Sequence, residues 1–66
     1  MESEYEKAVY YEHDLLQAAD TVLCQIDSDG IEYGGKDFSL LVRAVAKEYG
    51  VSRRDLKAKV KELMDD

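Results

Sequence analysis

One long apolar stripe near the amino terminus limits the folds that this chain can adopt. Between Ser3 and Ile26, apolar side chains recur at steps of three and four, which is the spacing of one face of an α-helix. The members of the stripe are Tyr5, Ala8, Val9, Leu15, Leu16, Ala19, Val22, Leu23 and Ile26. This spacing predicts a single amphipathic helix over residues 3–26.

Glu12 interrupts the stripe where the spacing calls for an apolar side chain. An unpaired carboxylate in a core is costly. We therefore expect Glu12 to reach the rim of the core and to pair with a Lys or Arg from the carboxyl-terminal half. The alternatives are a binding residue at this position, or a break in the helix near Glu12 and His13.

The segment DSDGIEYGGKD, residues 27–37, predicts the loop that ends this helix. Three glycines lie within it, and Asp27 and Asp29 are typical turn-forming residues. A calcium loop aligned on Gly30 would place Gln25 at the first ligand position and Lys36 where a bidentate glutamate is needed. We therefore expect no calcium in this loop.

A second helix is predicted after the loop. Asp37 is a suitable N-cap, and Leu41, Val42, Val45 and Tyr49 then follow at helical spacing. These positions predict a helix over residues 38–49.

A third helix is predicted over residues 53–64. Ser52 and Asp55 have the spacing of a capping box, and Leu56, Val60 and Leu63 form the apolar side that follows. Residues 1–66 are therefore expected to form one all-α domain. It consists of three helices, with a long amphipathic first helix and a tight turn between the last two.

That tight turn has the ingredients of a helix-turn-helix. Ala46 is small where the two helices come closest, and Gly50 permits the positive φ that closes the turn. Val51 is expected to fill the space between the helices. Residues 42–61 thus resemble the helix-turn-helix of small phage and bacterial repressors.

The resemblance implies a small DNA-binding transcriptional regulator or accessory factor. In that family the residues that open the second helix of the motif face the DNA groove, and Arg is the residue best able to make paired bonds to guanine. The corresponding positions in this sequence are Ser52, Arg53, Arg54, Lys57 and Lys61, with Ala58 and Lys59 beside them.

The charge distribution is compatible with DNA binding and also with binding to a basic protein. Residues 1–37 hold ten acids and two bases, whereas residues 38–66 hold five acids and seven bases, for a net charge of −6. An acidic chain lacks the general attraction to DNA that supplies much of the affinity, yet its basic half could dock while the acidic half faces away. The alternative is an acidic interaction module or DNA-mimicking inhibitor that binds a basic partner protein.

The length of the first helix predicts a homodimer. A helix of about 24 residues is about 36 Å long, and two helices of about 18 Å cannot cover all of its stripe. The bare part would form an interface with a second copy. The expected contributors are Tyr5, Val9, Leu16 and Leu23, with Tyr10 as a further contact residue on the opposite side.

The remaining expectations concern chemistry and location. His13 and Cys24 lie about three helical turns apart, too far to form a nucleophile and its base, and they are too few for a zinc site. We therefore expect no enzyme, metal or cofactor. The acidic start MESEYEK lacks the pattern of a signal peptide, no apolar run could span a bilayer, and the single cysteine favours a reducing compartment, so a cytoplasmic protein is expected.

Overall fold

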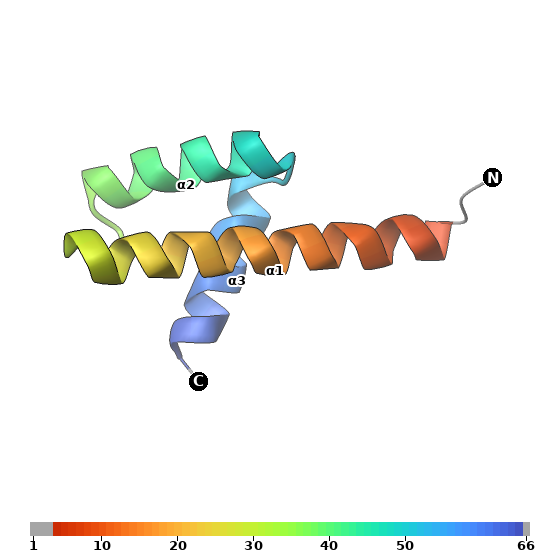
Figure 1. The fold of residues 1–66 in the computed structure, drawn as a ribbon, viewed down its shortest axis with the longest axis horizontal. Helices are drawn as coiled ribbons and strands as arrows, with labels where there is room; N and C mark the ends of the chain where they lie inside the picture. Colours follow the sequence, from red (N-terminus) through yellow and green to blue (C-terminus); the bar gives the residue numbers. More distant parts are fainter. Residues whose placement is uncertain (1–3, 66) are drawn as a thin grey trace.

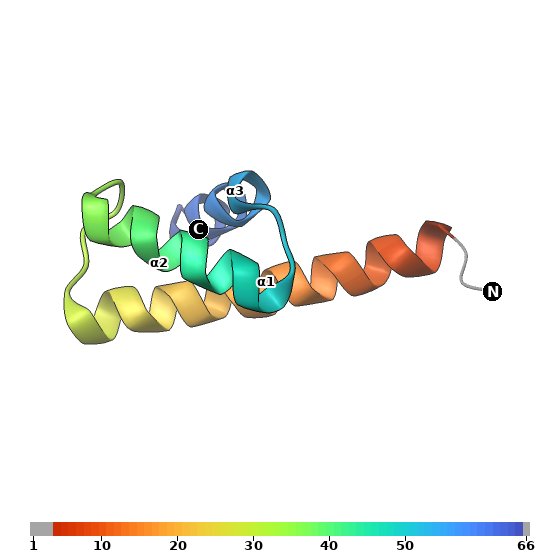
Figure 2. The ribbon, with the colours of Figure 1, turned by 90° about the horizontal axis from the view of Figure 1, so that it is seen from above.

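The computed structural model describes residues 4–65, with side chains described for residues 9–65. It confirms an all-α fold of three helices: α1 spans Glu4–Asp29, α2 spans Lys36–Tyr49 and α3 spans Arg53–Met64. α2 folds back beside the second half of α1, and α3 crosses both helices steeply (Figures 1 and 2). α3 has the bounds that the sequence predicts.

The core lies where the three helices meet. All three helices contribute large apolar side chains to it, and the small side chains of Ala18 and Ala19 of α1 and Ala46 of α2 are buried among them. The buried set is Leu15, Ala18, Ala19, Val22, Phe38, Val42, Val45, Ala46, Leu56 and Val60. Each fully buried large apolar side chain stabilises such a core by about 1.5–3 kcal/mol.

α1 ends three residues later than the sequence predicts. Asp27 and Asp29 were expected to form turns, but they lie in the last turn of the helix. The helix ends where Gly30 adopts a φ of 66°, and the Ile31 amide then donates to the Ile26 carbonyl at 3.2 Å. This bond between residues five positions apart is typical of a Schellman end, so Gly30 determines the end of α1.

α2 begins two residues earlier than predicted, so the loop covers residues 30–35. Asp37 was expected to be the N-cap, but that position belongs to Gly35, whose extended backbone makes no side-chain cap bond. Asp37 instead lies in the first turn of α2. A carboxylate there still interacts favourably with the helix dipole.

The predicted turn between α2 and α3 is confirmed. Gly50 has a φ of 70° and its amide donates to the Ala46 carbonyl, which also accepts the Val51 amide at 3.0 Å. Ala46 is buried and Val51 is partly buried against the core. The end of α2 therefore repeats the Schellman geometry found at Gly30.

α1 has no break near Glu12 or His13, which excludes the bent helix considered above. Glu12 instead pairs with Lys59 of α3, with Nζ and Oε2 3.9 Å apart, and its side chain stays mostly exposed. The rim pairing is thus confirmed. Because α1 is straight, its amino-terminal part projects beyond α2 and α3 (Figure 1), and Val9 and Leu16 keep 49% and 46% of their surface exposed.

Candidate nucleic-acid interface

The exposed side of α3 carries the basic side chains that the sequence singles out. Leu56 and Val60 are fully buried, and at 3.6 residues per turn the opposite side of the helix presents Arg54, Lys57 and Lys61. All three are exposed. α3 therefore holds its apolar side in the core and presents these bases to solvent.

Two hollows between α2 and α3 bring further bases to this side of the molecule. The first is lined by Ser39 of α2 and by Arg53, Arg54 and Lys57 of α3. The second is lined by Arg43, Ala46, Lys47, Val51 and Arg53. Because Arg53 lines both hollows, they adjoin. We refer to their five bases, Arg43, Lys47, Arg53, Arg54 and Lys57, as the basic face.

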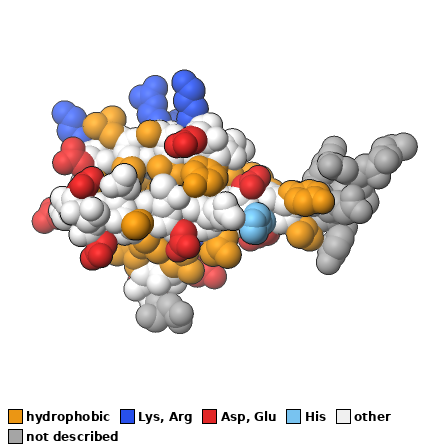
Figure 3. Space-filling model, in the orientation of Figure 1, with side chains coloured by type: hydrophobic (Ala, Val, Ile, Leu, Met, Phe, Trp, Pro, Cys, Tyr) orange, Lys and Arg blue, Asp and Glu red, His pale blue; other side chains and the backbone are white. Residues whose placement is uncertain are grey.

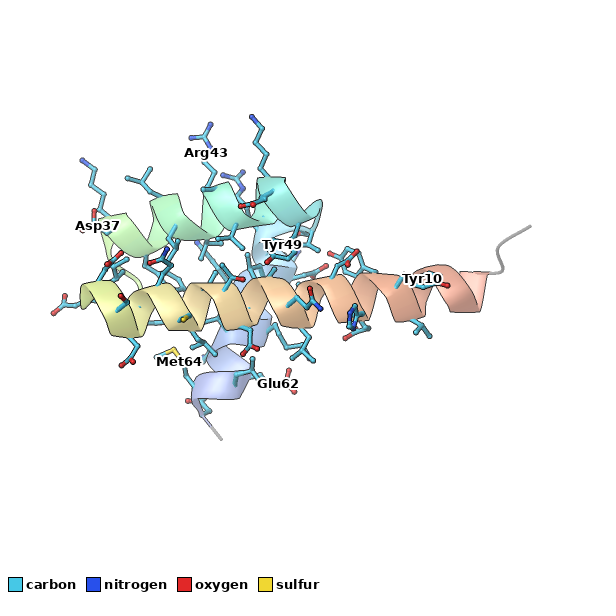
Figure 4. All side chains as sticks on the ribbon, viewed as in Figure 1. Tyr10, Asp37, Arg43, Tyr49, Glu62 and Met64 are labelled. Carbon is cyan, nitrogen blue, oxygen red and sulfur yellow. The ribbon has the colours of Figure 1, made fainter. Side chains whose placement is uncertain are left out.

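The basic face extends along α2, away from α1. Arg43 points outward from α2 on the side that faces away from α1 (Figure 4), and Lys and Arg side chains gather along this edge of the molecule (Figure 3). Carboxylates lie mainly over α1 in the same view. The uneven charge of the two halves of the sequence thus becomes a separation of charge in space.

No base of the basic face has an ion-pair partner among the side chains of residues 9–65. The two ion pairs within that range both involve Lys59, which contacts Glu12 at 3.9 Å and Glu62 at 3.6 Å. Acids outnumber bases in this chain, so partners were available. Five unpaired cations around adjoining hollows repel one another and favour a bound polyanion.

The α1 side of α3 has a different character. A hollow there is lined by Tyr11, Glu12, Leu15, Asp55, Ala58, Lys59 and Glu62. Three acids and one base line it. α3 therefore separates a mixed, acid-rich side, which faces α1, from the basic face.

The predicted capping box does not form. Ser52 occupies the N-cap position, but its side chain makes no cap bond. The Tyr11 hydroxyl of α1 lies between the two expected partners instead. It accepts the Ser52 amide at 3.1 Å and donates to Asp55 Oδ2 at 2.6 Å. Tyr11 of α1 thus bridges the Ser52 amide and the Asp55 side chain, which a capping box would join directly.

The bond to Asp55 holds the pKa of Tyr11 above its ordinary value of 10.0, because the hydroxyl must stay protonated to donate. The Ser52 amide opposes this shift, while burial and the negative charges of Asp55 and Glu12 add to it. Tyr11 is therefore a neutral donor at physiological pH.

A second hydroxyl contact fixes the other side of the turn. The Thr21 hydroxyl of α1 donates to the Gln17 carbonyl at 3.0 Å and lies 3.0 Å from the Tyr49 hydroxyl at the end of α2. Tyr49 is therefore the donor in the second bond. It points from α2 toward α1 (Figure 4). α1 thus holds the turn through Tyr49 just before Gly50 and through Tyr11 just after it.

The residues predicted for a dimer interface differ in exposure. Val9, Tyr10 and Leu16 are between 46% and 60% exposed, whereas Leu23 is partly buried against the core. The side chain of Tyr5 lies outside the described residues. Among the stripe side chains of residues 9–26, Val9 and Leu16 are therefore the exposed ones.

The sequence did not single out three residues of α2 that line the two hollows. Arg43 and Lys47 are four residues apart on α2, and Ser39 precedes Arg43 by one turn. This spacing of three polar residues, which places them on one side of α2, was the available signal. The resemblance to a helix-turn-helix predicted DNA-contacting residues only in the third helix and at its N-cap.

No protein-family model, curated protein or solved structure matches this chain. Within residues 4–65, no helix combines the length and the apolarity needed to cross a membrane. The same range contains no group of three His, Cys, Asp or Glu side chains placed to hold a metal ion.

Proposed function

We propose that this protein binds DNA through the basic face, as a small transcriptional regulator or accessory factor. The observation that supports this most is the set of five unpaired bases around two adjoining hollows of α2 and α3. Duplex DNA presents closely spaced negative charges along its backbone. It is therefore a polyanion suited to an extended basic surface of this kind.

The geometry of α3 supports a role as the helix that enters the major groove. That groove is about 12 Å wide and accepts one α-helix. α3 presents Arg54, Lys57 and Lys61 on its exposed side. Arg53 and Ser52 lie at its amino-terminal end, where helix-turn-helix proteins contact base edges. The Ser52 hydroxyl makes no cap bond and is free to contact DNA.

The bases of α2 have a different role in this proposal. Arg43 and Lys47 lie on the neighbouring helix and line the second hollow together with Arg53. In this arrangement they contact phosphates that flank the groove. Phosphate contacts fix the orientation of the protein but carry no sequence information, so α2 is expected to add affinity rather than specificity.

The net charge of −6 is compatible with DNA binding only because the charge is separated in space. The acids of α1 lie over the part of the molecule away from the basic face (Figure 3). At physiological salt, charges more than about 8 Å apart are largely screened. The affinity is therefore expected to be weak and strongly dependent on salt.

Titration with a mixed-sequence duplex tests the proposal. Binding is expected at about 50 mM salt and is expected to weaken markedly by about 200 mM, because bound counterions are released when phosphates are neutralised. Replacing both Arg53 and Arg54 by Ala should reduce the affinity. Binding that survives this double substitution would show that α3 does not contact the duplex.

The second candidate function is an acidic interaction module that binds a basic protein. It is favoured by one observation, the exposure of the α1 acids Glu12, Asp14 and Asp20. Charge reversal of Glu6, Asp14 and Asp20 to Lys should then abolish capture of a basic partner. The two functions are distinguished because the same reversal should strengthen binding to DNA.

We also propose that the protein is a homodimer through α1. The support is the length of α1 beyond the other helices (Figure 1) and the exposure of Val9 and Leu16 there. Helix-turn-helix proteins commonly dimerise so that two recognition helices reach successive major grooves. A dimer would therefore double the number of contacts to one duplex.

A further inference from the structure

We propose that Tyr11 is a positioning residue for the basic face, because it holds the Asp55 carboxylate on the α1 side of α3. This inference rests on the proposed function. Tyr11 makes both of its hydroxyl bonds to the start of α3, at 3.1 Å from the Ser52 amide nitrogen and 2.6 Å from Asp55 Oδ2. It therefore fixes the backbone and the one acid of the first turn together.

The position of Asp55 matters because of its neighbours. Asp55 follows Arg53 and Arg54 directly in the first turn of α3, and it is the single acid of that turn. A carboxylate beside these bases would repel an approaching phosphate. The two hollows of the basic face do not include Asp55, whereas the hollow on the α1 side does. The bond from Tyr11 thus keeps the acid away from the anion that the bases attract.

The hydrogen bond from the Ser52 amide to Tyr11 also helps to keep Asp55 on the α1 side of α3. The Ser52 amide is one of the free donors at the start of α3, and a capping box would have used the Asp55 side chain to satisfy it. Since the Tyr11 hydroxyl accepts the hydrogen bond from this amide, the Asp55 side chain is not needed as its acceptor. Ser52 and Arg53 are in turn held at a fixed place relative to α1.

Two other tyrosines provide matched controls. Tyr10 is the neighbour of Tyr11, is 60% exposed and makes no side-chain hydrogen bond within the described range. Tyr49 also joins α1 to the turn through its hydroxyl, at 3.0 Å from Thr21, but it makes no hydrogen bond to Asp55. Tyr10→Phe tests the loss of a hydroxyl alone, and Tyr49→Phe tests the loss of a stabilising contact beside the turn.

The experiment measures binding of a labelled mixed-sequence duplex at about 50 mM salt, at a temperature where circular dichroism shows every variant folded. Tyr11→Phe is expected to lower the affinity about three- to tenfold, because the released Asp55 carboxylate places one negative charge near the bound phosphates. Tyr10→Phe and Tyr49→Phe are expected to stay within about twofold of the parent.

The decisive variant combines Tyr11→Phe with Asp55→Asn. Removing the carboxylate should restore the affinity to within about twofold of the parent, although the unfolding midpoint stays as low as in Tyr11→Phe. Recovery of binding without recovery of stability cannot come from a merely structural role. Asp55→Asn with Tyr11 intact should change the affinity less than it does in the Tyr11→Phe background.

The outcomes separate this inference from the proposed function. A parent that binds the duplex, with Tyr11→Phe binding equally well, would overturn the role of Tyr11 and leave DNA binding standing. So would an Asp55→Asn effect of the same size in both backgrounds. A parent that binds no duplex would overturn the proposed function and this inference with it.

Discussion

The Tyr11 hydroxyl donates a 2.6 Å hydrogen bond to the Asp55 carboxylate across 44 positions of sequence. The same hydroxyl accepts the Ser52 amide, so the contact joins the long first helix to the first turn of the third. The fold thus fixes the start of α3 with a side chain from another helix. A local capping box would have satisfied the Ser52 amide without joining α3 to α1.

The Tyr11 bond should make stability depend on pH in the alkaline range. The folded-state pKa of Tyr11 is raised above 10.0, so its stabilising effect is complete below the ordinary pKa and is lost as the pH rises through the folded-state pKa. We expect Tyr11→Phe to lower the free energy of unfolding by about 1 kcal/mol at neutral pH. Urea unfolding of both proteins at increasing pH should show this difference shrinking above about pH 10.

Tyr10→Phe is the control for that measurement. It should match the parent at every pH, because Tyr10 is exposed and contributes no side-chain bond within the described residues. A difference between the parent and Tyr11→Phe that stays constant as the pH rises past Tyr ionisation would contradict the assigned bond.

Substitutions of Gly50 should lower the stability of the protein because of the backbone conformation at this position alone. Its φ is 70°, and a Cβ atom built there would meet nothing within 4 Å. Gly50→Val is therefore expected to cost about 1–2 kcal/mol through the left-handed conformation rather than through a clash. Gly50→Asn should cost less, since Asn tolerates this region. Thermal unfolding of the two variants would refute this explanation if Asn proved as costly as Val.

The free energy of unfolding should depend more on the buried Leu56 of α3 than on an exposed leucine. Leu56 is fully buried, whereas Leu40 of α2 is 54% exposed. Leu56→Ala is expected to cost about 2–5 kcal/mol, a large part of the stability of a domain this small. Leu40→Ala should stay within about 0.5 kcal/mol of the parent. Comparable losses in urea unfolding would mean that α3 is not packed as described.

The proposed homodimer should respond to salt in the opposite direction from DNA binding. Its interface would bring together two α1 helices rich in acids, and salt screens their repulsion. Sedimentation at tens of micromolar should show a species of twice 7.5 kDa, and Leu16→Glu should reduce it. Leu40→Glu is the control, since Leu40 is exposed on α2. A parent that stays at 7.5 kDa in high salt would exclude the dimer.

Local patterns predicted most of the fold. The spacing of apolar residues predicted three helices, and the glycine after Tyr49 predicted the turn at Gly50. The end of α1 was misplaced because Asp27 and Asp29 are common in turns, whereas the helix ends where the left-handed glycine stands. The position of the left-handed glycine therefore determines the helix end more than the turn preference of the residues before it.

The candidate site was only partly predictable for a different reason. The bases of α3 follow one another in sequence and were found there. Arg43 joins them through the packing of α2 against α3, which only the fold provides. The role of Tyr11 had no local signal, because its partners Ser52 and Asp55 lie more than forty positions away. A tyrosine in an amphipathic helix has many possible partners until the helices are placed.

The salt dependence of duplex affinity tests whether the basic face binds DNA. Each phosphate contact contributes a slope of about −0.9 to the plot of log affinity against log salt, so the parent should give about −3 to −5. Replacing Arg43 and Lys47, the bases assigned to phosphate contacts, together by Gln should make the slope shallower by about 2. Lys59→Gln should leave it nearly unchanged, because Lys59 pairs with Glu12 on the α1 side. No measurable binding at about 50 mM salt, or a slope that the double substitution does not alter, would contradict DNA binding by the basic face.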